Sequence, residues 1–296
     1  MIPKKIFFFW GNEKMSWMRY MTLYSFVKFN PEWKVSLYRC EPNEHNTKPW
    51  RESNQQDFFV FDGEDYYDRV NDLNIDVIDW DLDKDSLKKI SPSQKSNFFK
   101  WKMLSERGGI YSDTDILYLR PIDEYYKKIK DCNVAICYRH NPYFSIGLLA
   151  SSMYNRFFRD VYHNTRQTFN SIVYQNAGAV SLYCWLFSLV GVKVDPINDM
   201  DRFWNKVFST NFWEILEKHY PEMCFYNNDM SLVYHWNSSD IHKIFYERET
   251  QISNSCIGIH WYAGDPISQK FNCLLTERNH KAFDNTFTYF ANEVLK

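Results

Sequence analysis

The stretch SPSQKSNFFKWKMLSERGGIYSDTDILYLRP, residues 91–121, decides the architecture of this chain. Ser91 can cap a helix that has Pro92 at its first position, and Gln94 completes a capping box. The helix that follows is apolar over much of its circumference, which predicts that it is buried. Gly108 suits the left-handed position that ends helices, and the glycine after it allows a sharp turn into a short hydrophobic strand. We therefore expect a helix packed on a sheet.

Two carboxylates follow this strand, Asp113 and Asp115, and a second hydrophobic strand comes after them. In open α/β sheets, ligands bind at the carboxyl ends of the strands. Mg²⁺ and Mn²⁺ prefer oxygen ligands, commonly one or two carboxylates together with substrate phosphates. An isolated acidic triplet is often only a polar turn, but the helix, the paired glycines and the strand before it favour a metal site that holds a phosphorylated ligand.

The segment resembles the Asp-x-Asp region of the glycosyltransferase family 32 sugar-binding domain and of the large clostridial glucosylating toxins. The residues that match the family pattern at the same spacing are Ser96, Leu104, Gly108, Gly109, Tyr111, Asp113 and Asp115. Two positions depart from it: Asn97 stands where the family usually has Asp, and Lys100 where it usually has Arg. An Asn can hydrogen-bond a sugar hydroxyl and a Lys can neutralise a phosphate. The departures therefore bear on the identity of the donor more than on the fold.

The resemblance implies one GT-A-like α/β domain over residues 1–296, with a Rossmann-like nucleotide-binding sheet flanked by helices and with helical additions. Residues 1–120 would form the nucleotide-binding half, which ends in Asp-x-Asp. Residues 121–296 would form the acceptor- and sugar-binding half. The implied activity is that of a metal-dependent, retaining glycosyltransferase, expected to transfer a hexose. Its donor would be a nucleotide-sugar, with a UDP-sugar favoured, and its cofactor Mn²⁺ or Mg²⁺.

By the same resemblance, Asp115 is the first choice for direct metal ligation. Asp113 would bind the metal partly through water or contact the donor. Asn97 and Lys100 would hold the sugar and the phosphates, and Tyr111 belongs to the same donor-binding set. Asp113, Asp115 and Asn97 are thus the expected catalytic residues.

The amino-terminal run IPKKIFFFWG, residues 2–11, has the length and composition of a strand with a glycine stop. It resembles the family's opening strand, and in the toxins a Trp in a similar setting lies against the nucleotide base. Trp10 is therefore the expected base-stacking residue, an interaction worth roughly 1–3 kcal/mol; a core aromatic is the competing interpretation. An amphipathic helix at residues 15–29 and a strand at residues 33–39 are expected next, which begins a nucleotide-binding sheet.

Further along, we expect strands at residues 134–138 and 145–150 and helices at residues 155–169 and 179–189. Between the two helices, the segment YQNAG, residues 174–178, resembles the Asn- and Gly-containing loops that many GT-A enzymes place near the sugar. Asn176 and Gly178 are therefore expected to contact the donor, because the amide offers donor and acceptor groups and glycine allows close backbone approach. An ordinary loop at the start of a helix is the alternative.

His260 lies at the end of the hydrophobic strand in IGIHWYAGD, residues 257–265. It resembles a residue that completes the metal or diphosphate site in GT-A enzymes, and neutral imidazole is a competent Mn²⁺ ligand. A core histidine bonded to a backbone carbonyl is the alternative. His235 is a second, weaker candidate.

The composition agrees with a cytoplasmic enzyme that has no signal peptide. The formal net charge is −2, which indicates neither nucleic acid nor an anionic membrane as the main partner. The sequence has no apolar stretch of about 18 residues or more, so no transmembrane segment is expected. The 7 scattered cysteines are expected to be reduced thiols. Residues 41–57 are predicted to form a loop, and the acidic residues between 62 and 85 a solvated face.

The acceptor hydroxyl would belong to a glycan, a lipid-linked saccharide or a protein, with polysaccharide biosynthesis favoured. Three alternatives stay open. One is a haloacid-dehalogenase-type phosphatase, although Leu117 and the preceding βαβ unit oppose it. The others are a non-catalytic protein that binds sugar nucleotides and a toxin-like effector that glycosylates a protein.

Overall fold

The computed structural model describes residues 1–11, 14–40, 61–81, 90–138, 144–170 and 176–296, and the backbone of residues 51–53 and 56–57. Most of the polar segment at 41–57 lies outside the described residues. The same holds for Asp83 and Asp85 of the acidic region and for Tyr174 and Gln175 of the predicted sugar-side loop.

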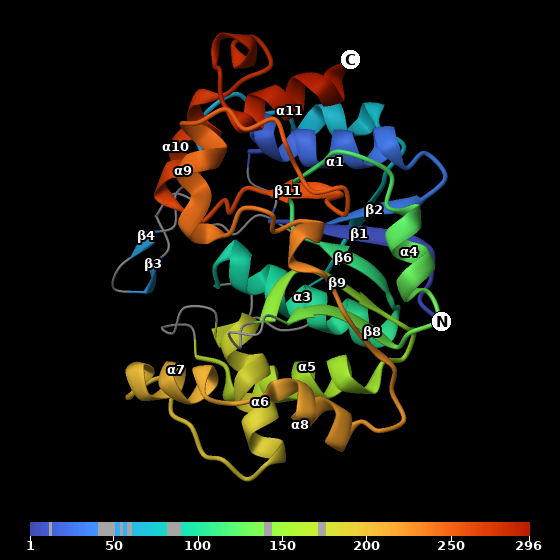
Figure 1. The fold of residues 1–296 in the computed structure, drawn as a ribbon, viewed down its shortest axis with the longest axis vertical. Helices are drawn as coiled ribbons and strands as arrows, with labels where there is room; N and C mark the ends of the chain where they lie inside the picture. The colour runs from blue at the N-terminus through green and yellow to red at the C-terminus, as the bar shows by residue number, and fades with distance from the viewer. Residues whose placement is uncertain are drawn as a thin grey trace.

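A seven-stranded mixed sheet forms the centre of the molecule, in the order β10-β8-β9-β6-β1-β2-β5 (Figure 1). Its strands are β1 (Lys5–Trp10), β2 (Lys34–Arg39), β5 (Asp76–Asp79), β6 (Gly109–Ser112), β8 (Val134–Tyr138), β9 (Phe144–Ser151) and β10 (Phe225–Asn227). The strands β6, β1, β2 and β5 are parallel, whereas β9 runs antiparallel to both β6 and β8. The predicted α/β class is confirmed, and β9 makes the sheet mixed.

Two small ladders lie outside the main sheet. One pairs β7 (Ile116–Tyr118) with β11 (Gly258–His260) in antiparallel fashion, and the other pairs β3 (Arg51–Ser53) with β4 (Gln56–Asp57). The strands expected near residues 2–11, 33–39, 134–138 and 145–150 are all present, and so is the strand that carries His260. The edge strand β5 was not anticipated, because its residues DVID are largely exposed and lack an alternating pattern.

Helices cover both faces of the sheet (Figure 1). One face carries α1 (Trp17–Phe29), α9 (Ile241–Phe245), α10 (Pro266–Leu274) and α11 (Thr286–Leu295). The other carries α3 (Pro92–Glu106), α5 (Arg156–Thr168), α6 (Ser181–Leu189), α7 (Met200–Phe208) and α8 (Phe212–His219). Beside the sheet lies α4 (Asp123–Ile129), and the short helices are η1 (Tyr67–Asp72), η2 (Asn176–Val180), η3 (Met230–Leu232), η4 (Ser238–Asp240) and η5 (His280–Ala282).

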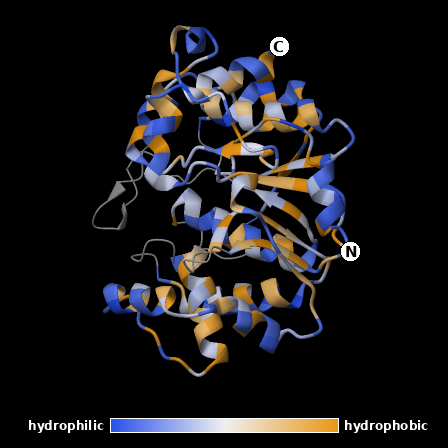
Figure 2. Ribbon diagram, viewed as in Figure 1, coloured by the Kyte–Doolittle hydropathy of each residue, from blue (hydrophilic) through white to orange (hydrophobic). Residues whose placement is uncertain are grey.

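Alternation along β1 divides the hydrophobic core into two layers. Ile6 and Phe8 belong to the core that includes α1 and α11, whereas Phe7 and Phe9 belong to the core that includes α3, α5 and α6. Successive side chains on a strand point to opposite faces, so an apolar run without polar interruptions requires cover on both sides. Figure 2 shows the hydrophobic strands between the two helical layers.

The helix expected at residues 15–29 is present as α1, capped by Ser16, but its amphipathic character was predicted wrongly. Most of its residues are buried, because α11 and the η5 segment cover the side away from the sheet. The hydroxyl groups of Thr22 and Ser25 on this helix form hydrogen bonds with backbone groups of the neighbouring chain segment. Thr22 Oγ1 donates to the carbonyl of Thr114 (3.0 Å), and Ser25 Oγ accepts from the amide of Tyr118 (3.0 Å).

The helix α3 and its ending agree with the prediction. Ser91 and Gln94 form the reciprocal capping box. Gly108 has φ 58° and Gly109 has φ 106°, both in the region that favours glycine. A Cβ on Gly108 would lie 2.6 Å from the backbone of Ser152, so the turn also needs the space that glycine leaves. The chain then enters β6, which carries the acidic triplet to its carboxyl end.

The described acidic residues between 62 and 81 are all exposed, which confirms a solvated face in that part of the chain. The helices predicted at residues 155–169 and 179–189 are present as α5 and α6, and the turn η2 precedes α6. Within the described residues, every helix is too short or too polar to cross a membrane.

Candidate active site

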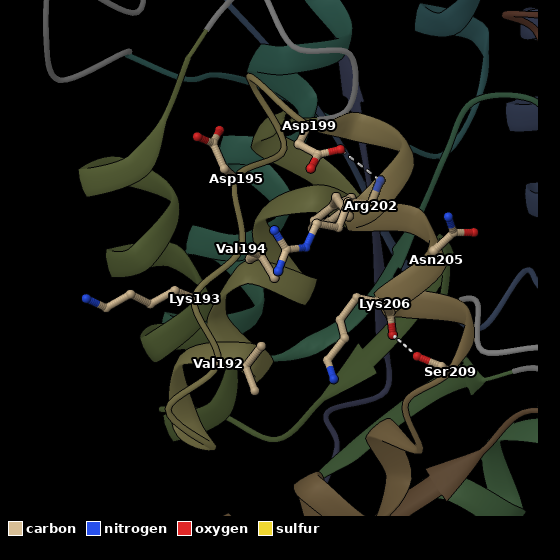
Figure 3. Close-up of a pocket in the computed structure, with 10 residues that line it drawn as sticks. Val192, Lys193, Val194, Asp195, Asp199, Arg202, Asn205, Lys206 and Ser209 are labelled. Carbon is tan, nitrogen blue, oxygen red and sulfur yellow. Dashed lines mark hydrogen bonds between the residues drawn. The ribbon is translucent and has the colours of Figure 1, made fainter.

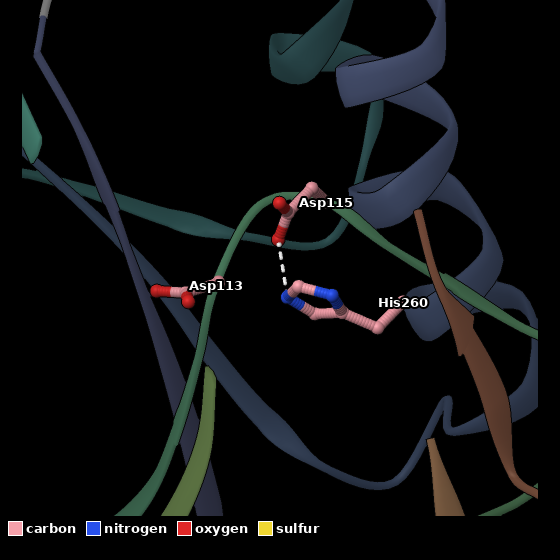
Figure 4. A group of neighbouring side chains, drawn as sticks. All are labelled: Asp113, Asp115 and His260. Atoms are coloured by element: carbon pink, nitrogen blue, oxygen red, sulfur yellow. Dashed lines mark ion pairs between the residues drawn. The ribbon is translucent and has the colours of Figure 1, made fainter. Parts of the chain in front are cut away.

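Asp113, Asp115 and His260 meet where three strands end or begin (Figure 4). Asp113 follows β6, Asp115 precedes β7, and His260 ends β11. The antiparallel pairing of β7 with β11 places His260 opposite Ile116, next to Asp115. One ligand atom from each of the three side chains lies within 4.8 Å of the others. We call this group the Asp–Asp–His cluster.

The carboxylate of Asp115 is buried but strongly stabilised. Its Oδ1 lies 3.2 Å from His260 Nε2, and its Oδ2 accepts a hydrogen bond from the amide of Ala263 at 2.8 Å. Burial raises the pKa of Asp115, but the neighbouring His260, the Arg19 guanidinium and the Ala263 amide outweigh it, so the pKa lies well below the usual range. Asp115 is therefore held as an anion.

The backbone after His260 adopts the conformation that brings the Ala263 amide to Asp115. Tyr262 has φ 50°, a conformation that is uncommon for residues other than glycine. The amide of the next residue, Ala263, is the one that donates to Asp115 Oδ2, while the amide of Trp261 donates to the Asp115 carbonyl at 2.9 Å. The loop after β11 thus holds Asp115 by its side chain and by its backbone.

The two oxygens of Asp113 have different surroundings. Oδ1 accepts a hydrogen bond from the Tyr111 hydroxyl at 2.5 Å and lies 3.3 Å from the Lys100 ammonium. Oδ2 faces the other way, toward Gly147 and His260: a Cβ built on Gly147 would lie 3.0 Å from Asp113 Oδ2 and 3.1 Å from His260 Nε2. The protein therefore binds Oδ1, whereas Oδ2 lies beside Gly147.

The side chains of Lys100 and Tyr111 are buried, and both contact Asp113. The Lys100 ammonium donates to the carbonyl of Ile146 at 3.2 Å and lies 4.5 Å from the centre of the Tyr111 ring. Burial lowers the pKa of Lys100, and the nearby Asp113 carboxylate opposes that effect. The Tyr111 hydroxyl also bonds to Ser96 Oγ at 2.7 Å. The predicted donor contacts of Lys100 and Tyr111 stay predictions; in the structure both side chains orient Asp113.

Asn97 lies on α3, one turn before Lys100, and is buried. Its side chain forms no hydrogen bond with the described part of the chain. Its expected role in binding the sugar stays a prediction.

The predicted sugar-side loop packs against α3. Asn176 is buried, and its Oδ1 accepts a hydrogen bond from the amide of Asn170 at 2.7 Å. Gly178 lies in η2, and the neighbouring carbonyl of Ala177 accepts from Trp101 Nε1 at 2.7 Å. The Trp101 bond joins this part of the loop to the helix that carries Asn97 and Lys100, and the Asn170 bond joins it to the segment after α5. Neither Asn176 nor Gly178 belongs to the Asp–Asp–His cluster, and their contacts with a donor remain a prediction.

Trp10 ends β1 and is 6% exposed, so only a small part of its ring reaches solvent. The guanidinium of Arg19 lies 5.3 Å from the centre of this ring and 5.5 Å from that of Trp261. Arg19 also donates to Thr114 Oγ1 at 2.6 Å. Sequence reasoning missed Arg19, because it precedes the acidic triplet by a whole βαβ unit and no local motif marks it. Base stacking by Trp10 is not tested by this geometry.

Gly147, Val233 and Tyr234 complete the surroundings of the cluster, and no sequence motif marks them. The Gly147 carbonyl accepts from the Asp113 amide at 2.7 Å, and the Gly147 amide donates to the Tyr234 hydroxyl at 3.1 Å. The carbonyl of Val233 accepts from the His260 amide at 2.8 Å. The weaker candidate, His235, is exposed and does not belong to the cluster.

A cavity of about 880 Å³ lies apart from these residues, between the segment at 192–195 and α7 (Figure 3). Lys193, Arg202 and Lys206 contribute cations to its lining, whereas Asp199 accepts from the Arg202 amide and caps α7. None of the residues predicted from the sequence lines this cavity. The Asp–Asp–His cluster, whose two carboxylates and imidazole are groups of the kind that bind metals, is therefore the candidate active site.

The sheet, the acidic turn at its carboxyl edge and the helix before it form the GT-A-like α/β fold that the sequence predicts. Residues 10–133 match the family described as glycosyltransferase sugar-binding region containing DXD motif. The matched stretch runs from the end of β1 to the start of β8 and includes α3, Asp113 and Asp115. It confirms the resemblance found in the sequence and favours the transferase interpretation over the phosphatase alternative.

Several glycosyltransferases of known structure are similar to this chain in fold. The PaToxG glycosyltransferase is 16% identical, with 74% of this chain and 77% of that chain covered and a TM-score of 0.45. The glycosyltransferase GlyE of Streptococcus pneumoniae is 9% identical, with coverages of 98% and 63% and a TM-score of 0.41. The galactosyltransferase LgtC, in complex with donor and acceptor sugar analogues, is 12% identical, with coverages of 80% and 91% and a TM-score of 0.37. No curated protein matches the sequence.

Proposed function

We propose that the chain is a metal-dependent glycosyltransferase that moves one sugar, a hexose, from a nucleotide-sugar to an acceptor hydroxyl. The observation that carries the proposal is the convergence of Asp113, Asp115 and His260 within 4.8 Å. The two aspartates lie inside the stretch that matches the sugar-binding region. A UDP-sugar is the favoured donor and retention of the anomeric configuration the favoured outcome. Residues 1–120 would bind the donor, and residues 121–296 would complete the sugar site and bind the acceptor.

The cluster suits a hard divalent cation. The proposed ligand atoms are Asp113 Oδ2, Asp115 Oδ1 and His260 Nε2, two carboxylate oxygens and one imidazole nitrogen. Asp115 Oδ1 is buried, and its contact among the described residues is with His260 Nε2 at 3.2 Å, which leaves part of its acceptor capacity for a ligand. Imidazole with carboxylates favours Mn²⁺, whereas Mg²⁺ prefers oxygen alone. Mn²⁺ is therefore the first choice of metal and Mg²⁺ the second.

A metal that contacts both the cluster and the diphosphate would stabilise the charge that develops on the departing nucleoside diphosphate. The protein's own part is to fix the ligand atoms. Tyr111 and Lys100 hold Asp113 by Oδ1, so that Oδ2 keeps one direction. The amide of Ala263 holds Asp115 in the same way, by Oδ2. Such outer contacts orient metal ligands and limit the reorganisation that the reaction requires.

The donor's sugar and phosphates would lie against α3. The Asn97 amide can donate to one hydroxyl and accept from another, and Lys100 places a buried positive charge next to Asp113. In a retaining transfer the departing phosphate can take the acceptor proton on the same face. Positioning and electrostatic stabilisation would then supply the rate, and no strong base on the protein is required.

The first experiment is hydrolysis of the donor by purified protein, since many transferases slowly transfer their sugar to water. UDP-, GDP- and CMP-sugars are incubated with Mn²⁺, Mg²⁺ or EDTA, and the released nucleotide is measured. We expect release of one nucleotide with metal, a loss of about 100-fold or more in Asp115→Ala, and little change in Asp68→Ala, which removes an exposed carboxylate. The anomer first formed, followed by NMR, tests retention.

The remaining alternatives give different results in the same assay. If no nucleotide is released but calorimetry shows tight binding of one sugar nucleotide, the chain is a non-catalytic binder or requires its acceptor. Addition of glycan, lipid-linked or protein acceptors then separates those two cases, and a protein acceptor would identify a toxin-like effector. Absence of binding to every sugar nucleotide would overturn the assignment of the acidic turn.

A further inference from the structure

Two cysteines that lie far apart in the sequence meet at the edge of the central sheet. Cys132 lies in the turn between α4 and β8, and Cys224 directly precedes β10. Their Sγ atoms are 3.2 Å apart although 92 residues separate the two positions. Both thiols are free in the structure. A disulfide bond has an S–S length of about 2.05 Å, so the two sulfurs need to approach by only about 1 Å.

Three hydrogen bonds fix the backbone around this pair. The amide of Cys224 donates to Asn133 Oδ1 at 2.8 Å. The Cys224 carbonyl accepts from the amide of Asn133 at 2.8 Å and from that of Val134 at 3.1 Å. Immediately afterwards β10 pairs with β8, with Phe225 opposite Val134. The contact between the sulfurs therefore follows from the register of the sheet and not from the rotation of two loose side chains.

The two thiols differ in their access to solvent. Cys224 is exposed, whereas Cys132 is 8% exposed. Burial raises the pKa of the Cys132 thiol to about 12, helped by its neighbour Cys224. Only a thiolate attacks a disulfide, and it must reach the oxidant. Cys224 is therefore the residue that meets an oxidant first, and Cys132 is the resolving partner beside it.

We propose that Cys132 and Cys224 are a disulfide-forming pair that small-molecule disulfides oxidise. The Cys224 thiolate attacks one sulfur of oxidised glutathione, breaks its S–S bond and releases one glutathione thiolate. Cys132 then loses its proton and attacks Cys224 Sγ, which expels the second glutathione thiolate and closes the protein disulfide. The two protein thiols lose two electrons and two protons in total, and one oxidised glutathione gains them to give two glutathione molecules.

The bond would fasten an edge strand. In the main sheet β10 is a terminal strand, and its ladder is formed with β8 alone among the described strands. The chain leaves β10 toward Val233 and Tyr234, which contact His260 and Gly147. A covalent link at Cys224 thus anchors the start of a segment that ends at the candidate active site.

The test is thiol counting on the full chain. Purified protein is equilibrated with mixtures of reduced and oxidised glutathione, quenched with acid, denatured, alkylated with N-ethylmaleimide and weighed by mass spectrometry. We expect the oxidised protein to accept two fewer alkyl groups than the 7 of the reduced protein, and dithiothreitol to restore them. Peptide mapping of the oxidised wild-type protein should show Cys132 joined to Cys224.

Two variants make the assignment specific. Cys132→Ser should stop after the first step, with glutathione attached to Cys224. Cys273→Ser, which removes a thiol outside the pair, should still lose two alkylation sites on oxidation. A full set of alkylatable thiols in wild-type protein under excess oxidised glutathione would overturn the proposal. A crosslink between other cysteines would also overturn it, and both readouts on wild-type protein are independent of how the variants fold.

Discussion

Arg19 donates a hydrogen bond of 2.6 Å to the hydroxyl of Thr114, the middle residue of the acidic triplet. The same guanidinium lies over the rings of Trp10 and Trp261, and Thr22, one turn further along α1, donates to the Thr114 carbonyl. Contacts from α1 therefore fix the position of the turn that carries both candidate metal-binding carboxylates. Contacts of this kind fix the direction of metal ligands without touching the metal.

We expect Arg19→Met to weaken Mn²⁺ binding by about 10-fold or more, since the loss of an outer contact typically costs 10–100-fold in metal affinity. Electron paramagnetic resonance of free Mn²⁺ in titrations with UDP present measures the change. Thr114→Val removes the same hydrogen bond but keeps the Arg19 charge, so a similar loss in both variants would assign the effect to the bond. Wild-type affinity in both would show that α1 does not position the cluster.

Gly147 supplies the space in which the cluster converges. A Cβ at this position would lie 3.0 Å from Asp113 Oδ2 and 3.1 Å from both His260 Nε2 and the Tyr234 hydroxyl. We expect Gly147→Ala to displace these groups and to lower metal binding and donor hydrolysis at least 10-fold, with a loss of stability of about 1–3 kcal/mol from overpacking. Activity, Mn²⁺ titration and urea unfolding of the same preparation separate the two effects.

The matched control is Gly264→Ala, in the loop after β11, where an added Cβ meets nothing within 4 Å. This variant should keep metal affinity and activity within about twofold of wild type. If Gly147→Ala binds Mn²⁺ and turns over donor like the control, then Asp113 Oδ2 and His260 Nε2 are not the ligand atoms.

A feature of the fold or of the candidate site could be predicted from the sequence where the residues that determine it are neighbours in the chain. The capping box of α3, the left-handed Gly108 and the strand that ends at the acidic triplet are all set by neighbours in the chain, and each was predicted correctly. His260 was proposed as a ligand from its place at a strand end, and the structure brings it to Asp115.

Contacts between distant segments could not be predicted in this way. Arg19 meets Thr114 only because α1 packs over β7, and Gly147 faces the cluster only because β9 inserts antiparallel beside β6. The amphipathic interpretation of α1 was wrong for the same reason: α11, near the end of the chain, covers its outer side. Spacing of cysteines along the sequence likewise gives no hint that Cys132 and Cys224 are adjacent.

Alkaline pH should destabilise the fold through Cys256. Its thiol is buried and donates to the Gly258 carbonyl at 3.0 Å, and burial raises its pKa from 9.0 to about 12. Between these two values the unfolded state loses a proton that the folded state keeps, so stability falls as pH rises, by up to about 1.4 kcal/mol per pH unit.

Urea unfolding of wild type and Cys256→Ala at pH 8 and pH 10 isolates this contribution. Other groups affect both proteins equally, so the free energy of unfolding should fall by about 1 kcal/mol more in wild type than in the variant. Equal falls in the two proteins would mean that the Cys256 thiol ionises in the folded state much as it does in the unfolded chain.

The proposed disulfide should stabilise the chain in addition to changing its thiol count. A bond between Cys132 and Cys224 closes a loop across 92 residues of sequence, and restriction of the unfolded chain by a loop of that size is typically worth about 2–4 kcal/mol. We expect oxidised wild-type protein to unfold at higher urea concentration than reduced protein, with the difference abolished in Cys224→Ser. Because the backbone of Cys224 is already fixed by Asn133 and Val134, little folded-state strain should offset the gain. An oxidised protein no more stable than the reduced one would show instead that closing the last 1 Å or so distorts the edge of the sheet by as much as the crosslink stabilises it.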